Sequence, residues 1–266
     1  MRRLLLAGCM SAALLGGPYT IVNAETTTLL AAMSVQPDQR RTRIIDTFIG
    51  ALKAAGVWSK LDVMWVLAAH DEQAGRLNWK SPGDFTLTAV NSPTFTVDRG
   101  FAGNGSTSYL DTGWDAATNG GQFTRNDGHI MAYSRTNGSG NLALFGISNV
   151  YNISVVSRTG TAMRGRVNAG SDVASTDSGG AQPLMTMIRR DGASSTGVLR
   201  DGVQVGTGTQ ASTAPSSTDL NFGRVGGAYY NGQAAGGSLG AYLDDTEAAA
   251  YYNAWHDYMV ALGADT

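Results

Sequence analysis

The chain has 266 residues, carries a formal net charge of −2 and is 42% hydrophobic, with five tryptophans. This length and apolar content suffice for one large β-domain with additional elements, or for two small domains. A nearly neutral chain lacks the basic surface that nucleic acid or an anionic membrane would attract, so we expect neither as a partner. Cys9 is the only cysteine, which excludes an intrachain disulfide and a zinc site built from several cysteines.

Residues 1–36 form an N-terminal segment that admits two interpretations. Two arginines precede an apolar stretch at residues 4–15, and a small-residue motif ends at Ala24, so residues 1–24 imitate an export signal. Alternatively, the segment is an uncleaved attachment arm that packs on a partner protein. No apolar run approaches the roughly 20 residues needed to cross a bilayer, so we expect no membrane span.

Residues 37–83 are predicted to be a helical block. Apolar residues recur at a spacing of three to four between residues 44 and 55, which predicts an amphipathic helix. A capping-box variant at Ser59 predicts a further helix that runs to Ala68. A cluster of turn-forming residues at 78–83 marks the end of the block.

Residues 84–266 are predicted to be a β-domain with a terminal helix. Asp201 and Gly202 separate two apolar runs, and such a pair predicts a type I′ hairpin because glycine tolerates a positive φ. About eleven runs with strand periodicity predict a mainly β, jelly-roll antiparallel β-sandwich. Asp244 and Glu247 form a capping box that opens a C-terminal amphipathic helix with an aromatic stripe.

An ordered set of motifs in residues 36–263 resembles known families. The motifs lie at residues 54–62, 68–71, 77–80, 101–113, 199–205, 219–224 and 240–247. The hairpin Leu-Arg-Asp-Gly-Val-Gln-Val and the motif that opens the terminal helix resemble laminin-G and concanavalin A-like domains. The earlier motifs are similar to those of tailed-phage and prophage virion proteins. The resemblance implies a concanavalin A-like sandwich carried on a phage particle.

The function that this resemblance implies is that of a non-enzymatic virion structural protein, as an appendage, fibre or capsid-decoration component. The implied partners are other virion proteins (capsid, portal or tail), further copies of the chain in a homo-oligomer, and a host surface glycan. A second hypothesis is an exported bacterial lectin-like protein, secreted or periplasmic, with residues 1–24 as its signal. A third hypothesis is a glycoside hydrolase.

Sugar binding needs an aromatic surface beside polar donors and acceptors on loops. Trp114, Tyr151, Tyr229 and Tyr230 lie in or beside predicted loops, and Asn231 follows the last two in a Tyr-Tyr-Asn-Gly turn. An interface with neighbouring subunits would expose tyrosines equally well. The sequence therefore predicts a glycan site or a protein interface at these residues.

Calcium is a candidate cofactor, with Asp172, Asp177 and Asn221 as candidate ligands, because sandwiches of this type bind it through loop oxygens. The alternative is that these side chains are solvated turn residues. A glycosidase needs two carboxylates at a defined separation. No glutamate occurs between residues 73 and 246, and the aspartates there mostly occupy turn positions, where they cap the backbone. We therefore expect no catalytic residues.

Overall fold

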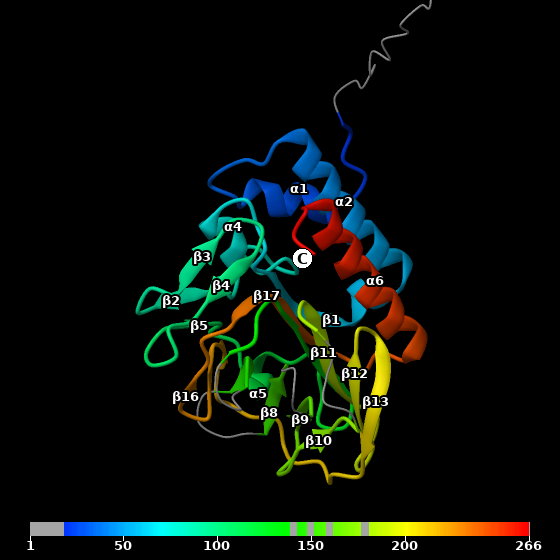
Figure 1. Ribbon diagram of the computed structural model, residues 1–266. Coiled ribbons are helices and arrows are strands. Elements are labelled where there is room, and N and C mark those ends of the chain that lie inside the picture. The colour runs from blue at the N-terminus through cyan, green and yellow to red at the C-terminus, as the bar shows by residue number, and fades with distance from the viewer. Residues whose placement is uncertain (1–18, 139–142, 148–151, 158–161, 177–180, 266) are drawn as a thin grey trace, which may run out of the picture.

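The computed structural model describes residues 19–138, 143–147, 152–157, 162–176 and 181–265. These residues form a mainly β protein in which two antiparallel sheets pack against each other as a sandwich, as the sequence predicts. The longer helices lie on the outer face of the larger sheet, so the described chain has three layers (Figure 1). No helix among these residues is long and apolar enough to cross a membrane.

The larger sheet is organised around one long strand, β17. In spatial order its strands are β13 (Val203–Gly208), β12 (Thr196–Arg200), β11 (Leu184–Arg190), β6 (Gly128–Ser134), β17 (Gln233–Gly240), β4 (Gly100–Ala102) and β3 (Thr94–Thr96), with β1 (Leu61–Val66) also paired with β17. The turn between β12 and β13 has φ values of 50° at Asp201 and 78° at Gly202. Both are positive, as a type I′ turn requires, so the predicted hairpin is confirmed.

The smaller sheet forms the other half of the sandwich. In spatial order its strands are β10 (Val173–Ala174), β9 (Arg164–Val167), β8 (Ile153–Val156), β7 (Phe145–Ile147), β14 (Leu220–Phe222), β5 (Tyr109–Asp111) and β2 (Thr88–Val90). A two-stranded ribbon of β15 (Arg224–Val225) and β16 (Ala228–Tyr229) follows β14. The core between the sheets contains Trp65, Phe145 and Phe222, and the rings of the last two stack at 3.9 Å.

The helical layer packs on the larger sheet through a second, aromatic core. Its helices are α1 (Ala24–Ala31), α2 (Gln39–Ala54), α3 (Val57–Lys60) and α6 (Asp245–Ala261), while α4 (Glu72–Arg76) and α5 (Ala116–Asn119) are short connecting helices. Phe48 of α2 contacts Trp255 and Tyr258 of α6 at ring distances of 5.3 and 5.0 Å. The predicted capping box opens α6, since Asp244 and Glu247 exchange two hydrogen bonds of 2.9 Å.

The segment that precedes α1 is fixed to α2 by Asp46, whose side chain is 2% exposed. One carboxylate oxygen accepts hydrogen bonds from the Tyr19 hydroxyl (2.6 Å) and the Val22 N–H (2.8 Å). The other accepts from the Asn23 N–H (3.0 Å), the Asn23 amide (2.9 Å) and the Thr26 hydroxyl (2.7 Å). Burial alone raises the pKa of Asp46, but these hydrogen bonds outweigh burial and hold the pKa well below its usual range.

The predicted helix at residues 59–68 is wrong, because Leu61–Val66 form strand β1, antiparallel to β17. Val63 and Trp65 contribute to the core between the sheets, while the other apolar residues of β1 join the core under the helices. A strand buried on both faces lacks the alternation that distinguishes a strand from a helix. The helical block predicted at residues 37–83 therefore contributes a strand to the sandwich.

Candidate functional site

Two of the predicted glycan-binding aromatics lie in the interior. Trp114 is 1% exposed, and its ring packs edge-on against Phe123 at 6.4 Å. Tyr230 is also 1% exposed, and its hydroxyl donates to the Thr136 carbonyl (3.0 Å) and accepts from the Gly138 N–H (2.8 Å). The prediction that these two rings are available on loops is wrong. Tyr151 lies outside the described residues.

Tyr229 is partly exposed, and a tight hairpin determines its direction. Gly226 and Gly227 connect β15 to β16 with φ values of 57° and 79°, so the connection is a second two-residue turn with both φ values positive. This turn pairs Arg224 directly with Tyr229 across the ribbon. Paired residues in an antiparallel ribbon project to the same face, so the two side chains lie together.

Tyr109 of β5 completes the group. Its ring lies 6.3 Å from the ring of Tyr229, and the guanidinium carbon of Arg224 lies 5.1 Å from the Tyr109 ring centre and 5.9 Å from that of Tyr229. All three side chains are partly exposed. We call Tyr109, Arg224 and Tyr229 the aromatic–arginine cluster.

Polar loop residues border this cluster. Asn231 is exposed, as the sequence predicts, and a Cβ placed on Gly105 would lie 3.2 Å from the Asn231 Cβ, so the loop around Gly105 touches it. That loop is organised by Asn104, whose side-chain oxygen accepts hydrogen bonds from the N–H groups of Ser106, Thr107 and Ser108 (2.8–3.0 Å). This loop leads directly into Tyr109, and Asn231 follows Tyr229 by two residues, so amide and hydroxyl groups adjoin the aromatic–arginine cluster along the chain.

Sequence analysis identified Tyr229 and Asn231 but missed Arg224 and Tyr109. A signal for Arg224 exists in the sequence, because Gly226-Gly227 between short β-compatible runs predicts a two-residue hairpin that pairs Arg224 with Tyr229. Tyr109 is more than one hundred positions earlier in the chain. Only the packing of β5 beside β14 brings it to the ribbon, so no local signal could have identified it.

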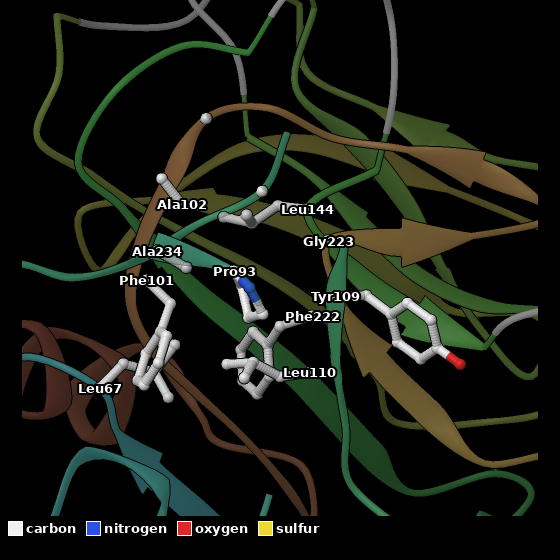
Figure 2. Close-up of a pocket in the computed structure, with 12 residues that line it drawn as sticks. Leu67, Pro93, Phe101, Ala102, Tyr109, Leu110, Leu144, Phe222, Gly223 and Ala234 are labelled. Carbon is white, nitrogen blue, oxygen red and sulfur yellow. The ribbon is translucent and has the colours of Figure 1, made fainter. Parts of the chain in front are cut away.

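The crevice beside Tyr109 is too small to be a binding pocket. It measures about 10 Å³ and is lined mainly by apolar side chains from both sheets, among them Phe101, Leu110 and Phe222. Figure 2 shows that Tyr109 points away from these side chains. A cavity of this volume holds about one water molecule, so a larger ligand beside Tyr109 would bind on the surface that the cluster forms.

A second hollow, of about 170 Å³, lies at the end of the larger sheet, between β11, β13 and Tyr242. Its main charged group is Arg189, which is 4% exposed. The guanidinium donates to the Leu243 carbonyl (2.8 Å), the Gln204 side chain (2.6 Å) and Asp245 (2.5 Å). Because the Arg189 guanidinium already bonds three groups of the protein, it is less available to a ligand than the guanidinium of the aromatic–arginine cluster.

The three predicted calcium ligands do not converge. Asp172 is ion-paired with Arg164 (3.0 Å) and Arg166 (2.6 Å), and Asp177 lies outside the described residues. Asp172 adjoins β10, which is four strands away from the Asn221 strand, β14. At about 4.8 Å per strand, this separation is about 19 Å. The predicted three-ligand set is therefore wrong.

Asn221 nevertheless lies among acidic groups. It is 2% exposed, and its side-chain oxygen has no hydrogen-bond partner, while its amide nitrogen is 3.4 Å from an Asp111 carboxylate oxygen and from the Asp219 carbonyl. Burial and the charges of Asp111 and Asp115 raise the pKa of Asp219. Nowhere in the described part of the chain do three His, Cys, Asp or Glu side chains gather into a metal-binding group.

Other ionisable groups with large pKa shifts lie in the core under the helices or at its edge. Burial lowers the pKa of His129 to about 4 and raises those of Tyr251 and Tyr258 to about 12. Their hydrogen-bonding atoms have partners in the protein, since His129 contacts the Ala241 carbonyl and both tyrosine hydroxyls donate. These shifts reflect burial in the core.

The fold and the cluster place the protein in the class of mainly β, antiparallel sandwich proteins. The sialidase of Trypanosoma rangeli is similar to it with a TM-score of 0.51 and 13% identity, over 79% of this chain and 38% of the sialidase. The receptor-binding domain of botulinum neurotoxin type G is similar with a TM-score of 0.50 and 15% identity, over 73% of this chain and 51% of that domain.

This chain therefore spans well under half the length of the sialidase. At such low identities the similarity concerns the fold. No protein-family model matches the sequence, and no curated protein matches it significantly.

Proposed function

We propose that this protein is a non-enzymatic, lectin-like binding protein whose aromatic–arginine cluster contacts a glycan. The observation that carries the proposal is the convergence of Tyr109, Arg224 and Tyr229 from three strands onto one partly exposed surface. Aromatic faces accept the apolar face of a sugar ring, while nearby polar groups bond its hydroxyls. The exposed Asn231 and the Asn104 loop supply such groups at the edge of the cluster.

A structural role for the aspartates supports a function without catalysis. Asp115 caps α5 by accepting from the Thr118 N–H (2.7 Å), and Asp111 accepts from the Gly113 N–H (3.2 Å). Asp127 accepts from the Tyr242 N–H (2.5 Å). The oxygens of these carboxylates are used to accept backbone N–H groups at turns and at a helix start, which explains their presence without a catalytic role. Glycoside hydrolysis is the less favoured alternative.

We also propose that the sandwich is a component of a phage particle, as an appendage, fibre or decoration protein, and that it forms a homo-oligomer. The resemblance of the motifs at residues 54–113 to virion proteins supports this proposal.

The arrangement of the layers is also compatible with a role on a phage particle. The helices cover the larger sheet, whereas the ribbon of β15 and β16 packs on β7 and β14 of the smaller sheet. One side can then attach to the particle while the other meets the host. An exported lectin-like protein is the alternative.

A glycan array with the purified protein tests the binding proposal. We expect binding to at least one glycan, and a loss of about tenfold or more in affinity for Tyr109→Ala and for Tyr229→Ala, because each ring supplies more than about 1.4 kcal/mol of contact. Tyr252→Ala on α6 is the matched control, since Tyr252 is a partly exposed tyrosine in the helical layer. Equal binding by all variants, or no binding to any glycan, would refute the proposed site.

Proteomic analysis of purified phage particles tests the location. Peptides of this chain at a fixed ratio to the capsid protein are expected if it belongs to the virion. Their absence from particles, together with recovery of the protein from a periplasmic or culture fraction, would favour the exported alternative.

A further inference from the structure

We propose that the aromatic–arginine cluster selects glycans that carry a carboxylate group. This inference rests on the proposed glycan-binding function and goes further by naming the chemical class of the sugar. It is carried by the electrostatic situation of Arg224, which differs from that of other arginines in the same sandwich.

Arg224 carries a positive charge that the described part of the chain leaves without an ion-pair or hydrogen-bond partner. Its Nε is buried and unbonded, and its guanidinium lies over the rings of Tyr109 and Tyr229. By contrast, Arg166 is paired with Asp172 at 2.6 Å, and Arg189 with Asp245 at 2.5 Å. Arg125 and Arg190 have no carboxylate partner, but they donate to Ser212 and to backbone carbonyls. Arg224 differs from all four of these arginines because it has neither an ion pair nor a hydrogen bond within the described residues.

The two tyrosines hold the guanidinium in a defined position. Both ring centres lie on the same side of the guanidinium, because they are 6.3 Å apart and only 5.1 and 5.9 Å from its carbon, so these rings leave its other side uncovered. Because Nε is covered while the side chain as a whole is partly exposed, the two outer nitrogens form the accessible edge. Two parallel N–H donors on one planar edge match the two oxygens of a carboxylate.

A neutral sugar would form fewer hydrogen bonds with the Arg224 guanidinium than a sugar that carries a carboxylate. A hydroxyl group accepts one hydrogen bond from the guanidinium and leaves the charge uncompensated, whereas a carboxylate accepts two and neutralises it. The tyrosine rings remain able to stack on the sugar that bears the carboxylate. The sialic acids and the uronic acids share this combination of a pyranose ring and a carboxylate.

Paired probes that differ only in the carboxylate test the proposal by isothermal titration calorimetry. The sialic-acid arm compares 3′-sialyllactose with its carboxyl-reduced form, and the uronic-acid arm compares trigalacturonate with its carboxyl-reduced form. We expect wild-type protein to bind the acidic member of at least one pair about tenfold more tightly or better, with an affinity that falls as salt increases. The arm that shows the preference identifies the source of the carboxylate.

Two substitutions assign this preference to Arg224. Arg224→Gln is expected to reduce the acidic-to-neutral ratio to near one, and Arg224→Lys to give an intermediate ratio, because lysine keeps the charge but lacks the planar pair of donors. Arg125→Gln is the control, since Arg125 is exposed and bonds Ser212 on another loop. Thermal melting of each variant identifies any loss of folding, and Arg224→Lys keeps the test valid if Arg224→Gln does not fold.

The outcomes separate this inference from the proposed function. Equal affinity for acidic and neutral probes, with loss of both in Tyr229→Ala, would overturn the carboxylate preference and leave glycan binding in place. A carboxylate preference that survives Arg224→Gln would also overturn it. Absence of binding to every probe and every arrayed glycan would overturn both.

Discussion

Asp46 joins helix α2 to the chain segment that precedes α1. The substitution Asp46→Asn tests how much this connection contributes to the free energy of unfolding. The carboxylate is 2% exposed and accepts five hydrogen bonds, from Tyr19, Val22, Asn23 and Thr26. An asparagine of nearly the same shape replaces one acceptor oxygen with an NH₂ donor. The Tyr19 hydroxyl can turn to accept from it, but the Val22 N–H would face another donor.

The expected cost follows from these contacts. A buried N–H left without an acceptor costs about 1–3 kcal/mol, and hydrogen bonds to a charged acceptor are stronger than those to a neutral one by about 1 kcal/mol. We therefore expect Asp46→Asn to lower the free energy of unfolding by about 2–4 kcal/mol. For a chain of this size, that corresponds to a fall in Tm of about 5–15 °C.

Urea unfolding followed by circular dichroism at pH 7 and at pH 3 measures the effect. Because the folded-state pKa of Asp46 is lowered, its contribution is fully present above the unfolded-state pKa of about 3.9 and is lost as the pH falls below that value. The difference between the two proteins should therefore shrink at pH 3. Glu25→Gln is the control, since its partner Lys53 is 39% exposed and the pair contributes at most about 1 kcal/mol.

The same contacts bear on the N-terminal segment. A chain that starts at Glu25, as cleavage after Ala24 would produce, lacks every donor to Asp46 except Thr26. We expect it to be less stable than the chain that starts at Tyr19 by about 3 kcal/mol or more. Stability within about 0.5 kcal/mol of the longer chain, or an Asp46→Asn protein as stable as wild type at pH 7, would refute the reasoning about Asp46.

Two further predictions concern calcium and a turn. If Asn221 and Asp219 provide oxygen ligands for calcium, about 5 mM Ca²⁺ should raise the free energy of unfolding by about 1 kcal/mol, and Asp219→Asn should abolish the rise; a melting temperature that does not respond to Ca²⁺ contradicts a calcium site at these two residues. Gly202→Ala should lower stability by about 2–3 kcal/mol in urea, because the residue has a φ of 78° and its Cβ would lie 2.8 Å from the Ala249 Cα. A loss under 0.5 kcal/mol would show that the turn can shift away from α6.

The sequence by itself determined the elements whose signals are local. Asp244 caps α6 in the structure as the sequence predicts, because a cap involves only the first turn of a helix. The Asp201-Gly202 hairpin is local in the same sense, because it depends on positive φ angles at two adjacent residues. Period-two apolar patterns predicted the sandwich, since one buried face suffices to produce them.

Tertiary structure alone decided which elements meet. Leu61–Val66 form a strand because they pair with β17 between two cores. A strand that is buried on both faces is apolar throughout, so its sequence lacks the alternation of apolar and polar residues that would predict a strand. Trp114 turned inward while Tyr109 remained partly exposed beside Arg224, although both are aromatic residues near loops. Solvent exposure and contact between distant strands depend on how whole sheets stack, and no local stretch of sequence carries that information.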